Sequence, residues 1–252
     1  PVWGEVNNIR NHYKQVTVHL QHRLTKRLMD VSFRVFEDGV GFRYEFPKQP
    51  GLKYFIVTEE KTVFNLTGDH KTFWIPGDYD TNEYAYTTSS LSAINNKTMV
   101  ESSTAIAVRT APDVHSVQTP LMMKTADGLY INIHEASLVN YPAMQLHVDT
   151  ATHQLTSSLV PDAYGNKAYL LAPFSTPWRT ILVSDKAADI LSSKMILNLN
   201  EPSKIKNTSW IKPMKFVGVW WEMQTGKGTW NYAASADDVD KEGQLIPSKR
   251  HS

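Results

Sequence analysis

The sequence has no cysteine, almost no net charge and no long apolar run. Without cysteine, the chain has no disulfide framework, no thiolate zinc site and no cysteine nucleophile. Lys and Arg number 26 against 25 Asp and Glu, so the net charge of +1 offers no basic excess for a nucleic-acid partner. No stretch approaches the roughly 18 apolar residues that a membrane-spanning helix needs. These absences leave a globular chain whose 41% hydrophobic content is enough for a sizeable core.

The sequence does contain a succession of short, alternating strand patterns. Residues 28–46 give the clearest one, because apolar residues alternate, stop at Asp38-Gly39 and then alternate again. This pattern predicts a hairpin with a positive-φ turn at Asp38-Gly39. Similar patterns occur at 15–24, 52–66, 104–111, 128–138, 143–149, 167–174 and 179–185. About a dozen short strands with turn signals between them predict a mainly β sandwich, with one clear helix before residue 200, at 185–193.

The character of the chain changes after residue 200. Residues 199–213 are polar and read as a linker, and a nearly continuous apolar run follows at 214–221. Such a run is typical of a strand buried on both faces, as in a parallel sheet or barrel. A (β/α)8 barrel needs about 250 residues, whereas only 39 remain from Met214 to the end. We therefore expect any barrel here to be truncated.

Glu135 interrupts the most regular strand pattern, at residues 129–141. Ile131 and Ile133 point to one face, and the next residue on that face is Glu135. On pattern alone, a hydrogen-bonded or solvated strand end is the more common explanation. The functional alternative is one ligand of a hard cation, because calcium takes 6–8 oxygen ligands. His134-Glu135 also resembles the start of a zinc-protease motif, but no second histidine follows four residues later.

Two further groups of residues are candidates for ligand binding. Trp178-Arg179 opens a strand after two nearby prolines. On pattern alone, a packed Trp178 with Arg179 paired on the surface is the more common explanation, and a pair facing a sugar or carboxylate is the functional alternative. Trp221-Glu222 ends the apolar run, where active sites form if that run is a barrel strand. The nucleophile-elbow and phosphate-loop motifs are absent.

Several segments together resemble the N-terminal part of glycoside hydrolase family 97, which comprises bacterial α-glucosidases and α-galactosidases. They keep the family's order along nearly the whole chain. The segments are PVWGEVNNIRNHY, SFRVFEDGVGFRYEFP, YINIHEASLVNYPAMQL, FSTPWRTILVS, ILNLNEPSKI and SWIKPMKFVGVWWEM.

The resemblance implies a fold, a domain order and a cofactor. It implies a galactose-mutarotase-like β-super-sandwich over residues 1–206, without its first strands, followed by the start of a truncated (β/α)8 barrel at 207–252. It implies Ca2+ at the active site, with Glu135 at the position of the glutamate that the sandwich domain contributes. The catalytic acid and the base or nucleophile belong to later barrel strands, so no catalytic residue is assigned. Trp178, Arg179, Trp221 and Glu222 remain candidates for substrate binding.

The function that follows is hydrolysis of α-glycosidic bonds in an oligosaccharide by the parent protein, in the periplasm or outside the cell. Its partners would be the substrate and the missing barrel domain of the same protein. The alternative is a non-catalytic carbohydrate-binding or structural β-sandwich module. We expect the chain alone to be inactive, and to associate or aggregate because a sandwich without its first strands exposes unpaired edges.

Overall fold

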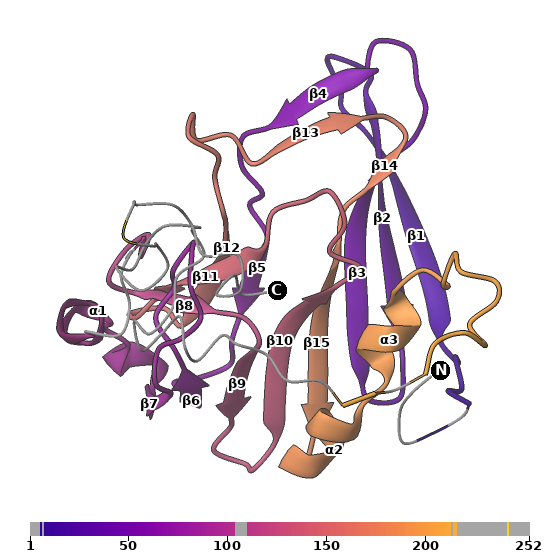
Figure 1. Cartoon of the computed structure of the whole chain (residues 1–252). Helices are drawn as coiled ribbons and strands as arrows, with labels where there is room; N and C mark the ends of the chain where they lie inside the picture. Colours follow the sequence, from indigo (N-terminus) through magenta and orange to yellow (C-terminus); the bar gives the residue numbers. More distant parts are fainter. Residues whose placement is uncertain (1–5, 7, 104–109, 213, 216–240, 242–252) are drawn as a thin grey trace. The chain divides into compact units, whose positions relative to one another are not determined.

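The computed structural model describes residue 6 and residues 8–103, 110–212, 214–215 and 241. The chain divides into one unit over Asn8–Ser203 and a second made of Pro1–Asn7 and Lys204–Ser252. The described part of the second unit contains only turns, bends and irregular backbone. Every strand and helix below therefore belongs to the unit Asn8–Ser203 (Figure 1).

A nine-stranded antiparallel sheet is the largest element of this unit (Figure 1). Its main path runs β1-β2-β3-β15-β10-β9-β6-β7, and β14 pairs with β3 beside that path. The strands are β1 (Lys14–Gln21), β2 (Leu28–Val35), β3 (Gly39–Phe46), β6 (Lys71–Trp74), β7 (Thr87–Ser90), β9 (Leu121–Lys124), β10 (Tyr130–Ala136), β14 (Phe174–Ser175) and β15 (Trp178–Ser184).

Two smaller antiparallel sheets complete the β structure. The four-stranded sheet has the order β5-β12-β11-β8 and contains β5 (Val63–Asn65), β8 (Ser116–Gln118), β11 (Met144–Asp149) and β12 (Gln154–Leu159). The two-stranded sheet pairs β4 (Tyr54–Val57) with β13 (Ala168–Leu171). The prediction of a mainly β chain with many short antiparallel strands is thus confirmed.

Two hydrophobic cores lie on opposite faces of the large sheet. The first combines large-sheet residues such as Leu121 and Ile133 with small-sheet residues such as Leu146 and Leu155, so the two sheets pack face to face. The second lies under the short helices α2 (Ala187–Ser192) and α3 (Met195–Leu199), which cover Trp178 and its neighbours. A third helix, α1 (Lys97–Ser102), follows a 3-10 turn at Leu91–Ala93. The predicted helix at 185–193 corresponds to α2, without a side-chain hydrogen bond at its N-cap.

The β2–β3 hairpin is present, but its turn differs from the prediction. Neither Asp38 nor Gly39 is among the positive-φ residues, so the expectation of a positive-φ turn was wrong. Gly39 is required for a different reason. A Cβ atom at this position would overlap the carbonyl oxygen of Ile181 on the neighbouring strand β15.

Some predictions fall outside the described residues. The proposed barrel strand at 214–221 is one, because residues 216–221 are not described and Met214 and Lys215 are irregular. Most of the predicted strand at 104–111 is another. No helix among the described residues is long and apolar enough to cross a membrane.

Candidate functional site

Glu135 and Arg179 meet between the large sheet and the four-stranded sheet. They are direct cross-strand partners of β10 and β15, so both side chains point to the same face. Arg179 Nη1 donates to Glu135 Oε2 at 2.5 Å, and the other carboxylate oxygen accepts the backbone N–H of Met144 at 3.1 Å. Ile133 is buried in the core on this face, so the predicted alternation is correct. Glu135 continues the buried stripe because a buried arginine lies opposite it.

A second carboxylate holds the other side of the guanidinium. Glu60, between β4 and β5, accepts Arg179 Nε–H at 2.8 Å and Nη2–H at 2.7 Å. This two-point contact uses the planar fork that arginine has and lysine lacks. Thr62 and Tyr141 donate their hydroxyls to Glu60 at 2.8 and 3.0 Å. Glu60, Arg179 and Glu135 therefore form one buried triad, which sequence analysis missed because the motif around Glu60 carries no distinguishing pattern.

The triad holds two carboxylates and one guanidinium, and the pKa values of the two carboxylates shift in opposite directions. Burial alone would raise the pKa of Glu60. The hydrogen bonds and charge of Arg179, together with the hydrogen bonds from Thr62 and Tyr141, lower it by more, so the pKa of Glu60 lies below its usual value. Burial dominates at Glu135, and its pKa is raised despite Arg179. The difference follows from geometry, since Glu60 accepts two guanidinium hydrogen bonds and Glu135 only one.

This geometry does not fit a calcium site. Both oxygens of Glu135 are occupied by hydrogen bonds, and its positively charged neighbour would repel a cation. Calcium needs several oxygen ligands, and the others that the resemblance implies belong to the barrel, outside the described residues. The described geometry thus gives Glu135 the role of an ion-pair partner.

Trp178 lies on the opposite face of the large sheet from Arg179. Its side chain is buried under α3, and the guanidinium groups of Arg43 and Arg34 lie 4.4 and 4.8 Å from its ring centroid. Such contacts stabilise a packed indole. The predicted pair Trp178-Arg179 is therefore split between two cores, and neither side chain reaches the surface of the described unit. Trp221 and Glu222 lie outside the described residues.

Asp78 is a further buried carboxylate, in the aromatic-rich loop after β6. Its oxygens accept the backbone N–H groups of Asp80 and Thr81 and the hydroxyls of Tyr84 and Thr110. Burial raises its pKa, but these hydrogen bonds outweigh burial and hold the pKa below its usual value. The carboxylate fixes the loop and leaves little capacity for a ligand.

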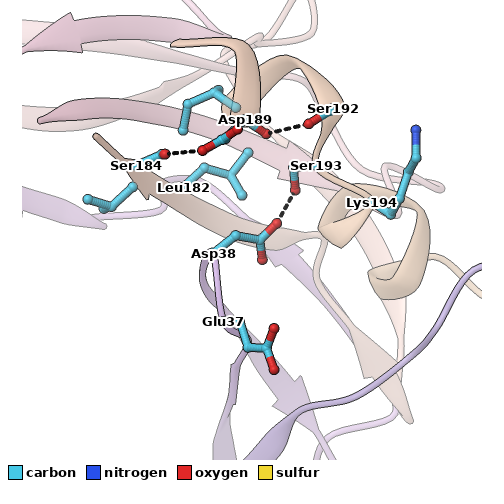
Figure 2. A pocket seen from close by; sticks show the side chains of 10 residues that line it. Glu37, Asp38, Leu182, Ser184, Asp189, Ser192, Ser193 and Lys194 are labelled. Carbon is cyan, nitrogen blue, oxygen red and sulfur yellow. Dashed lines mark hydrogen bonds between the residues drawn. The ribbon is translucent and has the colours of Figure 1, made fainter. Parts of the chain in front are cut away.

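A cleft lies beside α2, at the turn of the β2–β3 hairpin (Figure 2). Glu37, Asp38 and Asp189 line it, and two of these carboxylates accept a serine hydroxyl: Ser193 donates to Asp38 at 2.5 Å and Ser184 to Asp189 at 2.9 Å. Figure 2 shows that the Ser193–Asp38 contact joins the hairpin to the residues between α2 and α3, whereas the Ser184–Asp189 contact joins the end of β15 to α2. None of the predicted site residues lines this cleft.

Comparison with known proteins agrees with the family resemblance seen in the sequence. The family model of the glycosyl-hydrolase 97 N-terminal domain matches residues 1–202. A retaining α-galactosidase of Bacteroides thetaiotaomicron is 26% identical over 245 residues, which cover 85% of this chain and 33% of that protein. A probable retaining α-galactosidase of Streptomyces bingchenggensis is 26% identical over 197 residues, covering 76% of this chain and 26% of that protein.

Solved structures extend the comparison to the fold. A glycoside hydrolase family 97 enzyme of Pseudoalteromonas sp. strain K8, in complex with acarbose, is 30% identical with a TM-score of 0.68. The match covers 91% of this chain and 35% of that enzyme. A complex of the same enzyme with panose gives 31% identity and the same TM-score and coverage. The chain spans about a third of the length of these relatives.

Proposed function

Because the chain belongs to glycoside hydrolase family 97 through that family's N-terminal domain, we propose that it is the N-terminal portion of an enzyme that hydrolyses α-glycosidic bonds in oligosaccharides. The observation that carries this proposal is the family match over residues 1–202, supported by the likeness to an enzyme bound to acarbose or panose. The proposal includes both α-galactosidase and α-glucosidase activity, and the two α-galactosidases among the relatives support the first.

We propose that this domain is a β-super-sandwich that scaffolds a (β/α)8 barrel carrying the chemistry. Glycoside hydrolysis needs one carboxyl group that protonates the leaving oxygen and another that attacks the anomeric carbon or activates water. The buried carboxylates Glu60, Glu135 and Asp78 do not suit these roles, because each is held by several hydrogen bonds within the described unit. The proposed catalytic pair is therefore supplied by residues beyond this domain.

Three parts of the earlier prediction remain proposals. Calcium in the whole enzyme, with Glu135 as a ligand, is one, and the described contacts of Glu135 do not support it. Substrate contacts by Trp178, Arg179, Trp221 or Glu222 are another, and burial of the first two argues for packing roles. A periplasmic or secreted location is the third.

The experiment that tests the proposal compares the chain with a longer protein that contains it. Both are incubated with aryl α-galactosides and aryl α-glucosides, and release of the phenol is followed. We expect hydrolysis by the longer protein and none by the chain alone. Hydrolysis by the chain, or an inactive longer protein that binds glycans, would contradict the proposal, and the second result would favour a binding module.

A further inference from the structure

Strands β10 and β15 carry buried polar atoms on the face opposite the Glu135–Arg179 pair. His134 and Thr180 are the cross-strand partners next to that pair, so their side chains lie together on the other face of the large sheet. His134 Nδ1 and Thr180 Oγ1 are both buried, and neither atom has a hydrogen-bond partner among the described residues. The indole N–H of Trp178, two residues before Thr180 on the same face, is also buried without a hydrogen-bond partner there.

The layer that covers this face is apolar and belongs to the same unit, Asn8–Ser203. It is the second hydrophobic core, in which residues of α2 and α3 pack on Trp178 and Leu182 of β15. Leu199 of α3 reaches the sheet at Gly41, which is the cross-strand partner of Thr180 on β3. A buried hydroxyl or imidazole nitrogen without a hydrogen bond costs free energy, so native proteins pair nearly all such atoms with protein groups or ordered water.

The chemistry of the His134 and Thr180 atoms suits a water molecule. Burial lowers the pKa of His134, so the imidazole is neutral at pH 7 and has one donor and one acceptor nitrogen. A threonine hydroxyl both donates and accepts, and so does water, which can therefore bridge the two side chains with either tautomer of the ring. A bound ion fits poorly, because neither side chain carries a charge that would balance it.

We propose that an ordered water molecule is held between Thr180 Oγ1 and His134 Nδ1, as a second polar link between β10 and β15. Buried waters typically make about three hydrogen bonds, and Trp178, the diagonal neighbour of His134, offers its N–H as the third. The two strands are then joined by an ion pair on one face of the sheet and by a bridging water on the other.

The test compares two threonines that are both 0% exposed in strands of the large sheet. Thr72 of β6 donates its hydroxyl to the carbonyl oxygen of His70 at 3.0 Å, so Thr72→Val removes a direct hydrogen bond and is the matched control. Thr180→Val removes a hydroxyl that water satisfies, and we expect it to act in the same direction, with the equilibrium constant for unfolding in urea raised about fivefold. A constant that is unchanged or lower in Thr180→Val overturns the proposal, because removal of an unsatisfied buried hydroxyl stabilises a protein.

Nuclear magnetic resonance on the unmodified chain detects the water without any variant. We expect cross-relaxation between water and the methyl protons of Thr180, with the sign of a long-lived complex. The methyl protons of Thr72 are the control, because exchange of a buried hydroxyl proton with bulk water would affect both threonines. An equal signal at the two methyl groups, or none at Thr180, overturns the proposal. A direct hydrogen bond between Thr180 and the His134 ring, seen in the imidazole nitrogen resonances, also overturns it.

Discussion

Arg179 of β15 and Glu135 of β10 are direct cross-strand partners, and their charged groups meet 2.5 Å apart in the interior between two sheets. This contact explains why a carboxylate follows two isoleucines on an apolar stripe. The guanidinium supplies the buried counter-charge, and Glu60 supplies a second carboxylate on its other side. The pair thus links two neighbouring strands of the large sheet to the segment that leads into the small sheet.

Replacement of Arg179 should be the most damaging single change in this network. Arg179→Met leaves two buried carboxylates without a counter-charge, and breaking such a pair from one side costs about 3–5 kcal/mol. We expect this loss in the free energy of unfolding from urea titration. Lys61→Met is the control, because Lys61 forms an exposed ion pair with Glu59 at 3.2 Å and should change stability by about 0.5 kcal/mol or less. Equal effects would show that the triad does not stabilise the fold.

Asp78 should make the stability of the chain depend on acid pH. Its folded-state pKa is lowered, so its contribution is fully present above the unfolded-state pKa of about 3.9 and is lost as pH falls through the folded value. Asp78→Asn should cost about 2 kcal/mol at pH 7, since the amide has one acceptor oxygen where the carboxylate has two, which leaves donors such as Thr110 N–H and the Tyr84 hydroxyl without an acceptor. The difference in stability between the two proteins should shrink below about pH 4. A difference that is constant with pH would contradict this role.

Two glycines of β3 should respond differently to alanine. At Gly39 a Cβ atom would overlap the backbone carbonyl of Ile181, which cannot move without disturbing the sheet. At Gly41 the Cβ atom would lie 2.7 Å from Cδ1 of Leu199, a side chain that can rotate away. We expect Gly39→Ala to lower stability by about 2–3 kcal/mol and Gly41→Ala by about 1 kcal/mol. The reverse order in thermal unfolding would contradict the assigned contacts.

Calcium should not stabilise the chain through Glu135. Its carboxylate is engaged by Arg179 and Met144, and calcium needs several further oxygen ligands. Thermal unfolding with millimolar calcium and with a chelator should give the same midpoint, in the unmodified chain and in Glu135→Gln. A midpoint that rises with calcium only when Glu135 is intact would instead identify it as a metal ligand.

The strand pattern and its faces could be predicted from sequence, because alternation reports which side chains share a face. The hairpin at 28–46 and the face that Glu135 shares with Ile133 both followed from this rule. Strands β8 and β12 were missed because their buried positions carry serine as well as apolar residues, for example Ser116 and Ser157. The hairpin turn was misjudged because the Asp-Gly pair predicts a backbone angle, whereas Gly39 is needed for close approach to β15.

The partner of Glu135 could not be predicted from sequence. Arg179 lies 44 residues later and Glu60 lies 119 residues before Arg179, so only the folded sheets bring the three together. A strand-end carboxylate has the same sequence pattern whether it faces a cation, water or arginine. The resemblance to a family suggested calcium, and the contacts in the folded chain favour arginine.

The central claim is that Glu135 serves as the partner of Arg179, and a double-mutant cycle measures this most directly. Unfolding free energies are measured for the unmodified chain, Glu135→Gln, Arg179→Met and the double variant. If the two side chains interact as described, the double variant should be about 1–3 kcal/mol more stable than the sum of the single losses predicts. Additive losses would contradict the claim and return Glu135 to the set of residues available for another ligand.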